Sequence, residues 1–202
     1  MDAQPAPVPS RHRLKPAVVV GVLVVIAAGL VVLALRHPGL EPPRPSGLEG
    51  LGDGAPPVGR RAPDFSLPLL NGGTFSLHSV RGKPVVLNFW AAWCAPCREE
   101  TPMLVRLHKM YGPRGLQFVG VDSQDQTADA RAFASQYQVD YPLVRLDDDR
   151  LIDAYAVPGL PTTIFIGADG VVTGKVVGGF VGPEGEKLLI ARLDRLLAGA
   201  HR

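Results

Sequence analysis

Cysteine is scarce in this sequence, which has only Cys94 and Cys97 among its 202 residues. Two cysteines exclude a framework of several disulfides. A structural zinc site is also disfavoured, because it needs four ligands and the five histidines form no second paired motif. We therefore expect no metal and no cofactor beyond a redox-active Cys94–Cys97 disulfide. A purely structural disulfide stays open, although a two-residue spacer closes a loop too small to restrain the unfolded chain much.

An excess of charge of either sign is absent as well. The chain has 21 lysines and arginines against 19 acids, and beyond residue 35 the two counts are equal, at 18 each. Nucleic-acid-binding domains are typically basic over a face or a stripe. We therefore expect no nucleic acid among the partners of the folded part.

Charged and strongly polar side chains are missing from one long stretch, the 19 residues 17–35. A helix of about 20 apolar residues crosses a bilayer, so we predict a single transmembrane anchor there. Arg11, Arg13 and Lys15 precede this stretch. By the positive-inside rule, residues 1–16 are then cytoplasmic and the C-terminal part is extracytoplasmic, on the periplasmic or outer face of the cell membrane.

A cleaved signal peptide is the alternative for the same stretch, since Val32-Leu33-Ala34 is an acceptable cleavage triplet. The apolar region of a signal peptide usually has about 7 to 15 residues, so the greater length favours an uncleaved anchor. No cysteine follows the stretch closely, so lipoprotein processing is not supported. Residues 36–59 contain six prolines and six glycines and are predicted to be a linker.

Residues 60–202 are predicted to form one folded domain. Apolar and polar residues alternate on both sides of Asn71-Gly72-Gly73, and this pattern predicts a hairpin. Short apolar runs predict strands and amphipathic runs predict helices, in an order typical of parallel βαβ units. The strands are expected at 85–90, 116–121, 162–166 and 171–177, and the helices at 95–111, 127–137 and 183–199. We expect an α/β fold with a mixed four- to five-stranded sheet, helices on both faces and an extra N-terminal hairpin.

The two cysteines lie where the predicted strand 85–90 gives way to the predicted helix 95–111. Cys94 is then at a helix N-terminus, where unpaired N–H groups and the helix dipole favour the thiolate. Cys97 lies one turn into the helix, close enough to form a disulfide with it. We predict that Cys94 is the attacking thiolate, with the exposed sulfur, and that Cys97 resolves the mixed disulfide.

Residues Asn88 to Cys97, with the sequence NFWAAWCAPC, resemble the active-site segment of thioredoxin-fold proteins. The resemblance is greatest to the membrane-tethered TlpA/ResA branch, and it extends from about Gly59 to about Leu197. It implies a thioredoxin fold and a protein-disulfide oxidoreductase. Further matching segments occur in the family's order, and they are Ala62-Pro63-Asp64-Phe65, Gly82-Lys83, Pro102, Pro161-Thr162-Thr163 and Asp169-Gly170.

The resemblance also implies roles for residues around the motif. Trp93 is expected to border the surface where substrates dock, although a packed aromatic would fit its position equally well. Pro161 is implied to be cis and to face the dithiol, with the backbone of Leu160 pairing with substrate like an added strand. The base rate alone, about 5–6% cis for such bonds, predicts a trans bond.

Glu100 follows Cys97 by three residues, on nearly the same face of the predicted helix. An ordinary solvated acid is one interpretation. In ResA-like proteins an acid at this place lies under the cysteines and modulates their protonation, and a carboxyl in an apolar pocket exchanges protons near neutrality. Ala95 and Pro96, between the cysteines, are expected to tune the redox potential because they bring no cationic side chain.

The expected function is that of a membrane-anchored, extracytoplasmic oxidoreductase that reduces protein disulfides. Apocytochrome c is a candidate substrate, since the branch includes reductants of cytochrome c maturation, and a membrane thiol electron donor is required. Thr162-Thr163 stands where those reductants tend to place an acid, which leaves the substrate open. Two alternatives remain. One is a thiol peroxidase, although Ala91 stands where peroxiredoxins have threonine or serine, and the other is a copper-site reductant or metallochaperone.

Overall fold

The computed structural model describes residues 58–146 and 148–200. Its central sheet has the strand order β5-β4-β3-β6-β7. Strands β3, β4 and β5 run parallel, and β6 and β7 are antiparallel to their neighbours. The bounds are Val85–Trp90 (β3), Gln117–Asp122 (β4), Leu143–Arg145 (β5), Thr162–Ile166 (β6) and Val172–Val177 (β7). This mixed five-stranded sheet with flanking helices confirms the predicted thioredoxin-like α/β fold.

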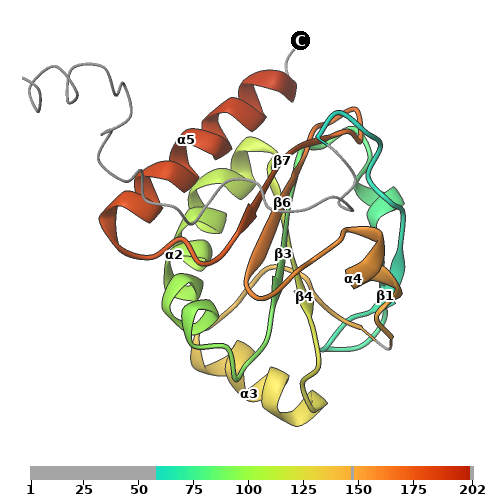
Figure 1. The fold of residues 1–202 in the computed structure, drawn as a ribbon, viewed down its shortest axis with the longest axis vertical. Helices are drawn as coiled ribbons and strands as arrows, with labels where there is room; N and C mark the ends of the chain where they lie inside the picture. The colour runs from blue at the N-terminus through green and yellow to red at the C-terminus, as the bar shows by residue number, and fades with distance from the viewer. Residues whose placement is uncertain (1–57, 147, 201–202) are drawn as a thin grey trace, which may run out of the picture. The chain divides into compact units, whose positions relative to one another are not determined.

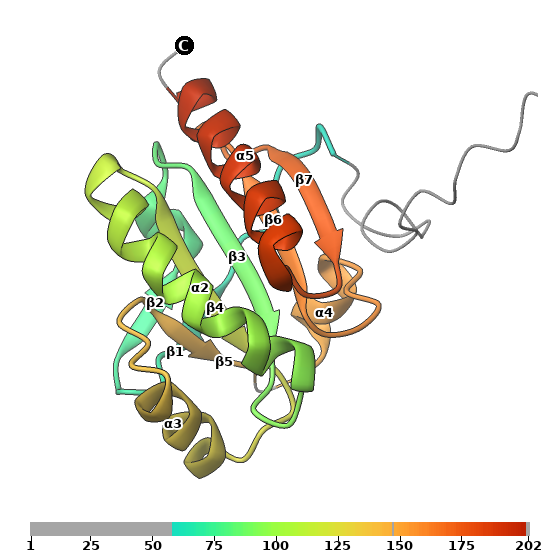
Figure 2. The same ribbon diagram turned by 90° about the vertical axis from the view of Figure 1, so that its left-hand side faces the viewer.

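All but one of the described α-helices cover one face of the sheet. The α-helices are Ala95–Tyr111 (α2), Thr127–Gln136 (α3), Arg150–Ala154 (α4) and Gly182–Ala200 (α5). Figures 1 and 2 show α2 and α5 side by side against the sheet. Because successive side chains of a strand point to opposite faces, Val86 and Trp90 of β3 join the core under these helices. Leu87 and Phe89 join the core on the opposite face.

The opposite face is covered by the N-terminal part of the domain and by α4. Strands β1 (Ser66–Pro68) and β2 (Thr74–Ser76) pair antiparallel and are followed by the 3-10 helix η1 (Leu77–Val80). A second 3-10 helix, η2 (Gly112–Arg114), follows α2. Side chains from β1, β2, η1 and α4 pack against the second core, so both faces of β3 are buried.

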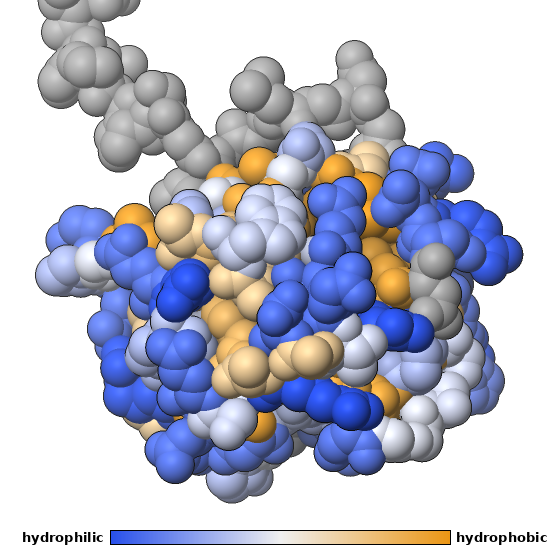
Figure 3. Space-filling model, turned by 90° about the horizontal axis from the view of Figure 1, so that it is seen from below, coloured by the Kyte–Doolittle hydropathy of each residue, from blue (hydrophilic) through white to orange (hydrophobic). Residues whose placement is uncertain are grey.

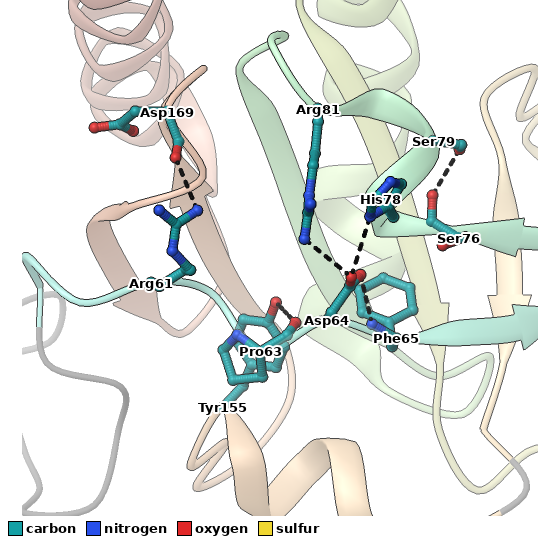
Figure 4. Close-up of polar contacts among 10 residues, drawn as sticks. All are labelled: Arg61, Pro63, Asp64, Phe65, Ser76, His78, Ser79, Arg81, Tyr155 and Asp169. Atoms are coloured by element: carbon teal, nitrogen blue, oxygen red, sulfur yellow. Dashed lines mark hydrogen bonds and ion pairs between the residues drawn. The ribbon is translucent and has the colours of Figure 1, made fainter.

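Polar contacts fasten the start of the domain to this face (Figure 4). The Tyr155 hydroxyl donates a 2.8 Å hydrogen bond to the carbonyl of Pro63. The Asp64 carboxylate lies 3.4 Å from the Arg81 guanidinium and 3.8 Å from the His78 ring. The segment that opens the domain is therefore held at both its backbone and its side chains.

The predicted cytoplasmic segment 1–16, the predicted anchor 17–35 and nearly all of the predicted linker 36–59 lie outside the described residues. Among residues 58–146 and 148–200, no helix is long and apolar enough to cross a membrane.

Candidate functional site

The cysteine motif lies where β3 ends and α2 begins. Cys94 is the N-cap of α2, with φ −77° and ψ 109°, and Pro96 occupies the first turn. The Cys94 Sγ accepts a 3.3 Å hydrogen bond from the backbone N–H of Cys97, and the two residues form a disulfide. Proline fits this position because the first N–H groups of a helix have no partner within the helix. The arrangement places the first sulfur at the positive end of the helix dipole.

Exposure differs sharply along the motif. Trp93 is 62% exposed, whereas Cys94 is 4% exposed and Cys97 is fully buried. The expectation of an exposed Cys94 sulfur was wrong for the disulfide form, because Cys94 is turned toward the N–H of Cys97 and packs in the core under the helices. Cys94 is slightly less buried than Cys97, and its role as the attacking residue stays a prediction.

Pro161 immediately precedes β6, and the Leu160–Pro161 peptide bond is cis. The base-rate prediction of a trans bond is therefore wrong, and the form implied by the resemblance is confirmed. In the antiparallel pairing of β3 with β6, Thr162 lies opposite Phe89, so Pro161 falls level with the last residue of β3. Pro161 is buried, while the preceding Leu160 is half-buried. The register thus brings Pro161 to the end of the sheet that carries the cysteines.

Glu100 is 1% exposed, one turn after Cys97 on α2. One carboxylate oxygen accepts a 2.9 Å hydrogen bond from the Asn88 side chain, and the other accepts one of 2.9 Å from the backbone N–H of Phe180. Burial raises the pKa of Glu100 to about 7, against the lowering effect of these two hydrogen bonds. The interpretation of Glu100 as a solvated surface acid is therefore wrong.

Asn88 is a member of the site that the sequence reasoning did not single out. Its amide donates to Glu100 and, at 3.0 Å, to the hydroxyl of Thr163 on β6. Asn88 is buried in the middle of β3, on the face that α2 covers. The signal for it was a polar amide inside an otherwise apolar run, since a buried amide needs hydrogen-bond partners.

The loop after β7 closes the site from the side of α5. Its Phe180 supplies the N–H that Glu100 accepts, and its Gly179 lies against Pro96. A Cβ atom at Gly179 would approach the Pro96 side chain to 3.2 Å and the Pro96 carbonyl to 3.3 Å, so glycine permits this close contact. Val181, which is 40% exposed, continues the loop onto the surface.

The surface around the motif combines apolar and polar patches. Figure 3 views the end of the domain where β3 gives way to α2, and apolar residues form a broken band there among hydrophilic ones. A pocket of about 320 Å³ beside Trp93 is lined partly by Arg98, Asp125 and Asp129.

Asp125 is a second residue that the sequence reasoning missed. Its carboxylate accepts a hydrogen bond of 2.5 Å from the backbone N–H of Ala92, two residues before Cys94. In the described ranges, no group of three or more histidine, cysteine or acidic side chains is arranged to hold a metal ion. The redox-active group that the structure does show is the disulfide between Cys94 and Cys97.

Comparisons with known proteins agree with this geometry. Residues 58–175 match the model of the AhpC/TSA family. The thiol-disulfide oxidoreductase ResA of Bacillus cereus (strain ZK / E33L) is 33% identical over 121 residues, which cover 60% of this chain and 70% of that protein. ResA of Bacillus subtilis (strain 168) is 37% identical over 120 residues, which cover 59% and 67%. A solved structure of a thiol:disulfide interchange protein from Chlorobium tepidum TLS superposes with a TM-score of 0.61 and 31% identity, over 69% of this chain and 97% of that one.

Proposed function

Because the chain belongs to the AhpC/TSA family and is a ResA-like thiol–disulfide oxidoreductase of the thioredoxin superfamily, we propose that it reduces protein disulfides outside the cytoplasm. Apocytochrome c is the candidate substrate, by analogy with the branch that the motif resembles. The apolar stretch 17–35 is the proposed membrane anchor. A membrane thiol electron donor would return the Cys94–Cys97 disulfide to the dithiol.

The buried carboxyl of Glu100 is the observation that carries the reducing direction. A strong oxidant of this fold stabilises its reduced form, and an anion near the thiolate does the opposite. Glu100 lies one turn below Cys97, and Ala95 and Pro96 bring no cation into the motif. The site thus favours the disulfide over the dithiol, which makes the dithiol a good electron donor.

The reaction follows from the positions of the two sulfurs. The Cys94 thiolate attacks one sulfur of the substrate disulfide, and the other substrate sulfur leaves as a thiolate that takes up a proton. Cys97 then loses its proton, attacks the Cys94 sulfur and releases the second substrate thiol. Two electrons and two protons pass to the substrate, and the protein is left with the disulfide seen here. Glu100, with a pKa of about 7, is suited to accept the Cys97 proton.

Substrate binding is assigned to the rim of the site. The exposed Trp93 supplies apolar contact area on one side of the motif. The backbone of Leu160, beside the cis bond to Pro161, supplies hydrogen-bonding groups for an extended segment on the other side. This arrangement would contact the backbone of the bound substrate segment more than its side chains.

Trapping of the mixed disulfide identifies the substrate. In cells that produce the full chain with Cys97→Ser, the Cys94 thiolate still attacks but cannot be displaced. The covalent partner is then purified and identified by mass spectrometry, with Cys94→Ser as the matched control. Enrichment of cytochrome c precursors supports the proposed substrate. If only Cys94→Ser captured a partner, Cys97 would be the attacking cysteine and Cys94 the resolving one. If the captured partners were other proteins, the substrate would not be apocytochrome c.

Peroxide reduction is the second candidate, because the family whose model matches this chain is the AhpC/TSA family. The buried Ala91 stands three residues before Cys94 and has no hydroxyl. The reduced chain is therefore expected to consume hydrogen peroxide no faster than a small dithiol does. The third candidate is a copper partner, for which a Cu(I) complex that survives a competing chelator would be the evidence.

A further inference from the structure

Two acids, Asp122 and Asp125, lie beside the motif, at the end of β4 and in the loop that follows it. Asp122 ends β4 and is the register partner of Trp90, the last residue of β3. The next residue, Ser123, donates its backbone N–H to the Trp90 carbonyl at 2.9 Å. The start of the loop after β4 is therefore fixed against the strand that leads into the cysteine motif.

Asp125 reaches from this loop to the motif itself. Its carboxylate accepts the N–H of Ala92, and the N–H of Cys94 is donated to the Ala91 carbonyl at 3.2 Å. The turn that joins β3 to α2 is thus held from inside by its own backbone and from outside by Asp125. Hydrogen bonds to an ionised acceptor are stronger than neutral ones, so Asp125 helps to fix the turn that precedes Cys94.

Asp122 is fully buried, and neither of its carboxylate oxygens accepts a hydrogen bond from any described residue. A buried ionised carboxylate without partners is unfavourable. A proton on Asp122 removes the charge and supplies a donor, and the Asp125 carboxyl is the neighbouring acid that raises the pKa of Asp122 further. A protonated Asp122 can donate a hydrogen bond to the Asp125 carboxylate, while that carboxylate accepts the N–H of Ala92.

Charged groups approach the pair from three neighbouring elements. Arg145 of β5 lies opposite Asp122 in the sheet and donates a 2.9 Å hydrogen bond to Thr127. Arg98 of α2 and Asp129 of α3 line the pocket to which Asp125 also contributes. Burial and the Asp125 carboxyl outweigh Arg145 and raise the pKa of Asp122 to about 8. Asp122 therefore holds its proton at neutral pH and loses it in mildly alkaline solution.

We propose that Asp122 and Asp125 are positioning residues for Cys94, in which the proton of Asp122 keeps the Asp125 carboxylate on the Ala92 N–H. Loss of that proton puts two carboxylates side by side in a buried place. Their repulsion moves the half-buried Asp125 outward, and the turn before Cys94 loses its external hydrogen bond. The inference rests on the thiol–disulfide chemistry that the family shares and is independent of the proposed substrate and location.

The test separates the reactivity of the Cys94 thiolate from the fraction of Cys94 that is ionised at each pH. Oxidation of the reduced full chain by glutathione disulfide is followed by stopped flow from pH 6 to pH 10, and the rate is divided by the thiolate fraction measured by ultraviolet absorbance. For the unaltered protein this normalised rate should be constant to about pH 8 and then fall about fivefold, as expected for one lost hydrogen bond. With Asp122→Asn, whose amide donates to Asp125 at every pH, it should stay flat.

Asp125 variants provide the second measurement. Asp125→Ala should lower the normalised rate at pH 7 about fivefold, and Asp125→Asn should restore most of it, because the amide oxygen can still accept the Ala92 N–H. Asp129→Asn is the matched control, an acid of the same pocket for which the structure gives no bond to the turn. An Asp122→Asn profile identical to that of the unaltered protein would overturn the proposal. If that variant fails to fold, equal rates for Asp125→Ala and Asp125→Asn would overturn it.

Discussion

The side chain of Asn88 donates a 2.9 Å hydrogen bond to Glu100, and this contact joins the central strand β3 to the helix that carries the cysteines. Through Asn88 the carboxyl is also connected to Thr163 of β6, two residues after the cis proline. One buried polar network therefore joins β3, β6, the cysteine-bearing helix α2 and the loop after β7. Such networks are rigid only when every member has its partners.

The first prediction concerns stability, because folding raises the pKa of Glu100 from 4.5 to about 7. The folded state then binds a proton more tightly than the unfolded state between these values, so the free energy of unfolding falls as pH rises through that window. The decrease due to Glu100 is on the order of 3 kcal/mol. Urea unfolding of the unaltered protein and of Glu100→Gln from pH 4 to pH 8 measures it. A difference between the two proteins that is independent of pH would contradict the prediction.

The second prediction concerns the influence of Glu100 on the dithiol. With Glu100→Gln the buried negative charge is lost, so the pH dependence of Cys94 alkylation should move to lower pH. Exchange with a disulfide substrate should become slower, since no group replaces the carboxylate as acceptor of the Cys97 proton. Glu99→Gln, an exposed acid one residue earlier, is the control. An unchanged alkylation profile would leave Glu100 a structural role only.

The third prediction separates the two bonds of Asn88. Asn88→Leu leaves both Glu100 and Thr163 without the amide, and we expect a loss of about 2–4 kcal/mol of stability from two unsatisfied buried groups. It should also raise the pKa of Glu100, because the Asn88 hydrogen bond lowers it. Thr163→Val removes only the link to β6 and should lower stability without moving the alkylation profile. Equal effects of the two substitutions on that profile would show that Asn88 does not act through Glu100.

Much of the framework is predictable from the sequence because local patterns determine it. The strands 85–90 and 162–166 and the helix 95–111 have the predicted bounds, since a long amphipathic or a fully apolar run leaves few alternatives. The strand β5 was missed, because its three residues, Leu143–Arg145, follow Pro142 and are too few to show a period. It forms through tertiary pairing, because its backbone pairs in parallel with the last three residues of β4.

The site was less predictable, because its members meet only through the tertiary fold. Cys94 and Cys97 follow from their spacing. Glu100 and the cis form of Pro161 came from the resemblance alone. The partners of Glu100 lie 12 and 80 residues away in the sequence, and the buried state of Cys94 depends on packing around the closed disulfide. No local pattern carries such information.

The fourth prediction concerns topology and tests the proposed anchor at residues 17–35. The full chain should remain in the membrane fraction after a high-salt wash. A protease added outside intact cells or spheroplasts should digest the domain, because the basic residues before the anchor keep the N-terminus inside. A cytoplasmic protein that resists digestion is the control for cell integrity. Protection of the domain from the protease would contradict the orientation.

The last prediction concerns the redox potential, which decides between a reductant and an oxidant. Stabilisation of the Cys94 thiolate raises the potential, and a histidine inside the motif provides it in the strong oxidants of the fold. Ala95 and Pro96 provide no cation, and Glu100 is buried one turn away. We therefore expect a midpoint near that of thioredoxin, roughly −270 mV, and far from the roughly −120 mV of a strong oxidant.

Equilibration of the full chain in detergent with glutathione or dithiothreitol redox buffers measures this midpoint. Pro96→His should raise it by about 30 mV or more, since that step corresponds to a tenfold change in the equilibrium constant. Pro96→Gln, a polar residue without charge, is the matched control and should raise it less. A midpoint above about −180 mV, the value for a disulfide isomerase, would be incompatible with a reductant and would make disulfide formation or isomerisation the better assignment.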